Sequence, residues 1–100
     1  MKIFNYGNPY DVKIKVSEYY NGNLCIQLVC ENGEPYGNLT VNFSKQLPVN
    51  MAYVDINNMP DAERFIRENS LGIFTGITNH SGYCEYPLYS FILENLWKEE

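Results

Sequence analysis

The sequence predicts an α+β domain in which an antiparallel sheet of four or five strands carries one helix on a face. Three observations favour this class: alternating apolar residues in the first half, tight-turn dipeptides between the alternating segments, and one helical pattern after residue 57. One hundred residues suffice for one hydrophobic core and not for two. We therefore expect residues 1–100 to form a single domain.

The first three expected strands form an antiparallel meander. Residues 10–19 alternate between apolar and polar side chains, as in a half-buried strand. Asn21-Gly22 then favours a type I′ hairpin turn, because both central positions of that turn need positive φ. Residues 23–31 form the partner strand, and Asn32-Gly33 leads into a third strand over residues 36–44. The side chains expected to face the core are Val12, Ile14, Val16, Leu24, Ile26, Leu28, Cys30, Leu39, Val41 and Phe43.

The second half adds a fourth strand and a helix. Residues 51–56 form the strand, Asn58 is a plausible helix N-cap, and Pro60 fits the first turn. The helix is expected to stop near Gly72 and, at about ten residues, must dock on the sheet to be stable. Its expected buried residues are Ala62, Phe65 and Ile66. The remaining residues are expected as a loop over 73–85, a strand over 86–93 and a frayed or helical tail over 94–100.

The charge balance bears on the class of partner. The formal net charge is -5, with seven lysines and arginines against twelve aspartates and glutamates. Nucleic-acid backbones are recruited mainly through basic side chains, so direct nucleic-acid binding is disfavoured. An acidic surface fits a protein partner, particularly a basic one.

The N-terminus and the cysteines indicate the compartment. The first residues contain no apolar run of signal-peptide length, and no segment approaches the ~20 apolar residues that span a bilayer. Cys25 and Cys30 lie an odd number of residues apart on one expected strand, so their side chains face opposite ways. With Cys84 as the third cysteine, reduced thiols are favoured over any disulfide. We expect a cytoplasmic protein.

The only histidine, His80, is the natural starting point for catalysis. Ser81 beside it suggests a nucleophile, with Asp55 as orienting acid, but adjacent side chains rarely point at one another. No G-x-S-x-G turn and no phosphate-binding glycine loop occurs. A turn histidine bonded to local backbone is the favoured interpretation, so we expect no enzymatic activity and no cofactor.

The sequence contains side chains that could bind a metal ion, but their spacing argues against a metal site. His80 and Cys84, helped by Cys25 or Cys30, offer the nitrogen and sulfur ligands that zinc accepts. The spacing matches no standard zinc finger, and the two strand cysteines face apart. We expect no metal.

Aromatic residues gather near the C-terminus and allow two interpretations. They form either a recognition surface or the closure of the open end of a small sheet. Their nearest charged neighbours are Glu85 and Glu94, so a basic stacking platform for nucleic acid is disfavoured. The rings are Tyr83, Tyr86, Tyr89, Phe91 and Trp97.

Several short motifs follow one another in a recognisable order over residues 10–93. They are Gly33-Glu34-Pro35-Tyr36, Leu39-Thr40-Val41-Asn42, Ala52-Tyr53-Val54-Asp55-Ile56-Asn57-Asn58, Thr75-Gly76, Ser81-Gly82-Tyr83 and Tyr86-Pro87-Leu88-Tyr89-Ser90-Phe91. In these motifs the chain resembles a family of small uncharacterised domains encoded on conjugative elements, plasmids and phages of gut and oral bacteria. The resemblance implies an accessory role in a mobile element and transfers no catalytic residue.

The sequence therefore favours a non-enzymatic, acidic protein-binding module from a mobile element. The resemblance suggests a host defence protein as partner, and a CRISPR-Cas nuclease with its basic nucleic-acid channel is the specific candidate. A single-stranded nucleic-acid binder that uses Lys13 and Lys15 with the aromatic rings is the alternative. The expected protein-binding residues are Glu31, Glu34, Asn79, His80, Tyr83, Glu85 and Tyr86.

Overall fold

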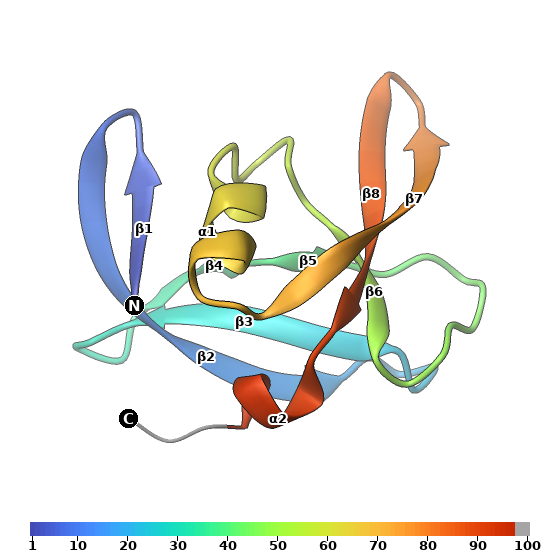
Figure 1. Cartoon of the computed structure of the whole chain (residues 1–100), viewed down its shortest axis with the longest axis horizontal. Helices are drawn as coiled ribbons and strands as arrows, with labels where there is room; N and C mark the ends of the chain where they lie inside the picture. The colour runs from blue at the N-terminus through green and yellow to red at the C-terminus, as the bar shows by residue number, and fades with distance from the viewer. Residues whose placement is uncertain (98–100) are drawn as a thin grey trace.

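The computed structural model describes residues 1–97 and has the expected α+β class. In place of one sheet of four or five strands it contains two antiparallel four-stranded sheets, ordered β1-β2-β3-β4 and β5-β6-β8-β7 (Figure 1). The strands are β1 (Lys2–Asn5), β2 (Asn8–Glu18), β3 (Leu24–Cys30), β4 (Pro35–Asn38), β5 (Thr40–Val41), β6 (Met51–Val54), β7 (Gly72–Ser81) and β8 (Cys84–Phe91). The helices are α1 (Ala62–Glu68) and α2 (Leu93–Leu96).

The first sheet contains the expected meander and one strand more. Strands β2, β3 and β4 follow one another through short turns, as the sequence predicts. The turn after β2 is not the predicted type I′ turn, because only Gly22 and not Asn21 has positive φ, and the Gly22 N–H donates to the Tyr19 carbonyl at 2.9 Å. The N-terminal strand β1 was not expected and pairs with the start of β2. Its turn consists of Tyr6 and Gly7, which both have positive φ, so the hairpin has the geometry of a type I′ turn.

The expected third strand over residues 36–44 is broken at Leu39, where the chain passes from one sheet to the other. The Leu39 N–H donates to the Ile26 carbonyl at 2.9 Å, and the Leu39 carbonyl accepts from the Asp55 N–H at 2.9 Å. Thr40 then places its hydroxyl where it accepts from the Ile26 N–H at 3.1 Å. The alternation of apolar residues continues through this step, so the sequence pattern did not reveal it.

The prediction of a loop over residues 73–85 is wrong, because this segment forms β7, the turn and the start of β8. Ile73 and Ile77 are 69% and 56% exposed, and Phe74 is exposed too. Since both faces of β7 meet solvent, its side chains show no apolar–polar alternation, and that alternation is what predicts a strand. β8 accordingly begins at Cys84 and not at residue 86.

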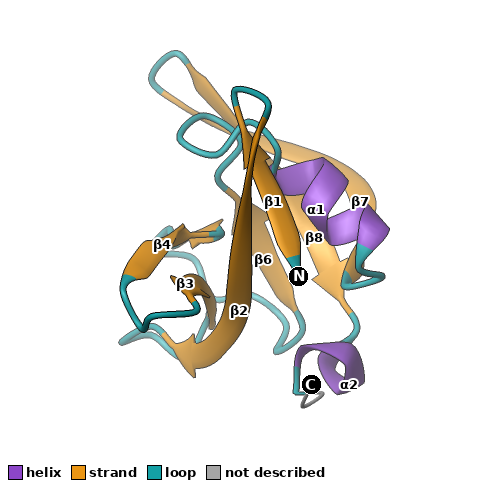
Figure 2. Ribbon diagram, turned by 90° about the vertical axis from the view of Figure 1, so that its left-hand side faces the viewer, coloured by secondary structure: helices purple, strands orange, loops and turns teal. Residues whose placement is uncertain are grey.

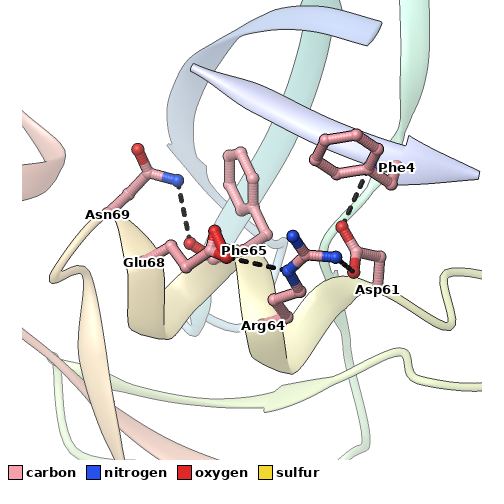
Figure 3. A network of polar contacts seen from close by, with 6 residues as sticks. All are labelled: Phe4, Asp61, Arg64, Phe65, Glu68 and Asn69. Atoms are coloured by element: carbon pink, nitrogen blue, oxygen red, sulfur yellow. Dashed lines mark hydrogen bonds and ion pairs between the residues drawn. The ribbon is translucent and has the colours of Figure 1, made fainter. Parts of the chain in front are cut away.

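Helix α1 is shorter than expected and begins later. Asn58 is not its N-cap, because its backbone N–H and its Nδ2 both donate to the Asp55 carboxylate within a turn before the helix. The helix ends at Glu68, where the Asn69 side chain donates to the Phe65 carbonyl at 2.9 Å (Figure 3). Gly72, the expected end, is already the first residue of β7.

One hydrophobic core lies between the two sheets and α1, which contacts β1 and β7 (Figure 2). Ala62, Phe65 and Ile66 of α1 are buried in it, as expected. Five of the ten strand residues expected to face the core are buried, and the other five are only partly buried: Ile14, Val16, Cys30, Val41 and Phe43. Of the frayed or helical tail expected over 94–100, residues 94–96 belong to α2 and Trp97 follows the helix. Residues 98–100 lie outside the described part of the chain. No helix in the described range is long and apolar enough to cross a membrane.

Candidate functional site

The β7–β8 hairpin projects from the body of the protein (Figure 1). Its outer half pairs Asn79 with Tyr86, His80 with Glu85 and Ser81 with Cys84. Gly82 and Tyr83 form a two-residue turn in which Gly82 has a φ of +63°, a conformation that favours glycine. Five of the seven expected protein-binding residues therefore lie on one hairpin: Asn79, His80, Tyr83, Glu85 and Tyr86.

His80 interacts with Glu85 directly across the hairpin. Its Nε2 lies 2.9 Å from a Glu85 carboxylate oxygen, and both side chains are exposed. An exposed pair of this kind contributes roughly 0–1 kcal/mol to stability. His80 forms no hydrogen bond with Ser81 or Asp55 in the described structure, and the Asp55 carboxylate binds Asn58 instead. The three residues considered for a catalytic group are thus not assembled.

The tyrosines of this region fall into two kinds. Tyr83 at the hairpin tip is 107% exposed, so nothing within residues 1–97 covers its ring. Tyr86 packs edge-on against Phe43, with ring centroids 5.3 Å apart. Tyr89 is buried and donates to the Glu63 carboxylate, and its burial together with this hydrogen bond raises the pKa of the phenol. The structure thus assigns closure of the fold to Tyr86 and Tyr89, and leaves Tyr83 available for contact.

Glu31 and Glu34 lie apart from the hairpin. They flank the turn between β3 and β4, and both are exposed. Figures 1 and 2 both place this turn at a different end of the molecule from the β7–β8 tip. The seven expected residues therefore form two separate groups.

The sequence profile of one family, a domain of unknown function named DUF4313, matches residues 13–99. The chain belongs to the DUF4313 family. No significant match exists among curated proteins or solved structures. The family description assigns no activity, so the function of this DUF4313 domain has to be argued from its own residues.

Sequence reasoning missed a second projecting hairpin in the DUF4313 domain. The β1–β2 hairpin points to the same end of the molecule as the β7–β8 hairpin, with α1 and its preceding loop between them (Figures 1 and 2). Its turn presents Tyr6, which is 92% exposed. The turn residues Asn5-Tyr6-Gly7-Asn8 were the sequence signal that could have predicted this hairpin. We name this end, with Tyr6 and Tyr83 at its two tips, the hairpin face.

The cysteines of the DUF4313 domain are all free thiols, with Cys25 buried and Cys30 and Cys84 partly buried. Cys84 pairs with Ser81 across the hairpin, whereas Cys25 lies in the first sheet opposite Ser17. Across residues 1–97, no three or more His, Cys, Asp or Glu side chains are grouped so that they could hold a metal ion.

Proposed function

We propose that this DUF4313 domain is a non-enzymatic protein-binding module that contacts its partner through the hairpin face. The observation that carries the proposal is the fully exposed ring of Tyr83 at the tip of a projecting hairpin. A tyrosine there does nothing for the packing of the core, and tyrosine is among the residues enriched at binding hot spots.

The charge of the chain supports a basic partner. The net charge is -5, and the hairpin carries Glu85 close to Tyr83. Complementary charge accelerates the encounter of two proteins and excludes partners of the wrong sign. Glu31 and Glu34 extend the acidic surface at another end, so they contribute to steering more than to one compact contact with Tyr83.

The specific version of the proposal is inhibition of a CRISPR-Cas nuclease of the host by a mobile element. The nucleic-acid channel of such an enzyme is strongly basic. A small domain of 100 residues with a net charge of -5 has the opposite charge needed to occupy part of that channel. The resemblance to domains encoded on conjugative elements, plasmids and phages supports this origin.

A DNA-cleavage assay with purified nuclease and guide RNA tests the specific version. Excess protein is expected to suppress cleavage by at least one effector type. Tyr83→Ala is expected to weaken the suppression, while Tyr20→Ala, which removes a tyrosine that is 91% exposed in another hairpin turn, is the matched control. Unchanged cleavage across several effector types removes the nuclease as partner, and equal behaviour of the two variants removes the hairpin contact.

Binding of single-stranded nucleic acid is the alternative. Lys13 and Lys15 lie on β2 with exposed side chains, whereas Tyr86, Tyr89 and Phe91 belong to β8 in the other sheet. The basic residues and these rings therefore do not form one surface, which favours the protein-binding proposal. A strong, salt-dependent mobility shift of labelled single strands would reverse this preference.

A further inference from the structure

A cleft of about 350 Å³ opens beside the β1–β2 hairpin. Three segments meet there: β1, β4 and the loop between β6 and α1. Phe4 and Asn5, which come immediately before the turn residue Tyr6, form part of its wall. The cleft thus adjoins one tip of the hairpin face. Its principal lining residues are Phe4, Asn5, Tyr36, Asn38, Asp55 and Asn58.

Asp55 is the one acidic or basic side chain among the residues that line this cleft. It is 7% exposed, and its carboxylate accepts two hydrogen bonds, from the backbone N–H of Asn58 at 3.1 Å and from Asn58 Nδ2 at 2.9 Å. Both donors are neutral, and no lysine or arginine lies within 4.0 Å of the carboxylate in the described part of the chain. A carboxylate offers about four acceptor positions, so about two remain. A buried charge without a counter-charge is costly, and a cation in the cleft would offset that cost.

The neighbouring cation, Arg64, is engaged elsewhere. Its guanidinium lies 4.8 Å from the centroid of the Phe4 ring and donates to Glu68 at 2.8 Å, with Asp61 at 4.0 Å (Figure 3). Arg64 is therefore held on the α1 side by two acidic residues and does not neutralise Asp55. This cation–π contact also shows that a guanidinium group can pack against the Phe4 ring.

The other lining residues suit a flat group that donates several hydrogen bonds. Asn5 and Asn38 form no side-chain hydrogen bond within the described residues, so their amide oxygens can accept one from a ligand. Phe4 and Tyr36 supply aromatic surface. A guanidinium is planar, carries five N–H donors and binds carboxylates in a bidentate manner, whereas an ammonium is compact and strongly hydrated.

We propose that the cleft binds a guanidinium group, supplied by an arginine side chain of the partner. Two N–H groups of the guanidinium donate to the Asp55 carboxylate, and the Asn38 amide oxygen accepts a further bond. That the arginine comes from a partner rests on the proposed function, in which the partner is basic. The preference of the cleft for a guanidinium group is independent of that function. An arginine seated there lets a partner loop lie across the hairpin face.

An NMR titration of the ¹⁵N-labelled protein with methylguanidinium chloride tests the cleft without any partner. Saturable shifts are expected at the backbone amides of Asn38, Asp55 and Asn58. Methylammonium chloride at equal ionic strength is expected to give weaker shifts there. Equal shifts from the two salts, or unsaturating shifts spread over the acidic surface, would overturn the proposal.

Two variants and one control locate the interaction. Asp55→Asn keeps the shape of the side chain and is expected to weaken methylguanidinium binding about tenfold or more, because the charged acceptor is lost. Asn38→Ala removes an exposed side chain that forms no hydrogen bond with the other described residues, so it is expected to fold normally and to weaken binding several-fold. Glu18→Gln makes the same change of charge at an exposed residue of β2 outside this cleft and is expected to bind methylguanidinium as the unchanged protein does. Undiminished binding by a folded Asp55→Asn or Asn38→Ala protein would refute the assignment.

The source of the guanidinium has its own test. Against a nuclease that the protein inhibits, Asp55→Asn is expected to lower the apparent affinity and Glu18→Gln to change it less. If methylguanidinium binds and Asp55→Asn inhibits undiminished, the partner does not place an arginine in the cleft. If no nuclease is inhibited, the specific function fails while the result of the titration stands.

Discussion

Replacing Thr40 with valine tests how the two sheets are joined. Thr40 is 1% exposed and lies directly after Leu39, where the chain passes between the sheets. Its hydroxyl oxygen accepts from the Ile26 N–H at 3.1 Å and lies 3.0 Å from the Tyr19 hydroxyl. Valine has nearly the same shape and lacks the hydroxyl, so the change removes these bonds with little effect on packing.

The expected cost follows from the group left without a partner. The Ile26 N–H becomes a buried donor without an acceptor, which costs about 1–3 kcal/mol. The Tyr19 hydroxyl keeps its bond to the Thr40 carbonyl at 3.0 Å, so it adds little. We expect a loss of about 2 kcal/mol in the free energy of unfolding, or roughly 8–16 °C in Tm for a domain of this size.

Urea unfolding followed by circular dichroism measures this loss. Thr40→Ser restores a hydroxyl and is expected to recover much of the stability, while Thr78→Val on the exposed part of β7 should stay within about 0.5 kcal/mol of the unchanged protein. A Thr40→Val protein as stable as the Thr78→Val control would refute the role assigned to the hydroxyl.

Three further predictions concern other parts of the fold. Asn23→Ala removes the side-chain hydrogen bonds that hold the segment after β5, so we expect a loss of about 2–3 kcal/mol in urea unfolding and faster amide exchange at Leu47. Gly72→Ala would place a Cβ 2.7 Å from the Ser90 carbonyl oxygen, so a decrease in Tm corresponding to about 1–3 kcal/mol is expected; an unchanged Tm would contradict this packing. Burial raises the pKa of Tyr19 to about 12 from 10.0, so unfolded Tyr19 loses its proton at lower pH than folded Tyr19. Stability is therefore expected to fall as pH rises from about 10 towards about 12, and less so in Tyr19→Phe, when urea midpoints are compared.

The meander was predictable because its signals are local. The alternation in β2 and β3 depends on one face being buried, and Asn21-Gly22 correctly marked the position of the turn between them. The predicted type I′ geometry was wrong, because of these two residues only Gly22 has positive φ. The helix was also predictable in kind, since its buried residues follow a helical period. Its start was not, because Asn58 bonds to the Asp55 carboxylate in a turn and does not cap the helix.

The β7–β8 hairpin was predictable as a candidate site but not as a structure. Its composition identified His80, Tyr83 and Glu85 as residues of interest. β7 and the start of β8 were missed because the side chains of β7 are solvent-exposed on both faces, which leaves no hydrophobic period. The hydrogen bonds that form β7 come from β8, and the sequence of β7 alone does not contain them.

The sequence by itself determined the α+β class, the antiparallel meander, the acidic character and the residues of the projecting hairpin. These depend on side-chain period, turn chemistry and charge, which act over a few residues or simply add up. The tertiary structure alone decided the step between two sheets at Leu39, the separation of Glu31 and Glu34 from Tyr83, and the cleft around Asp55. Each of these depends on which distant segments come into contact, and contacts between distant segments are set by the packing of the whole core.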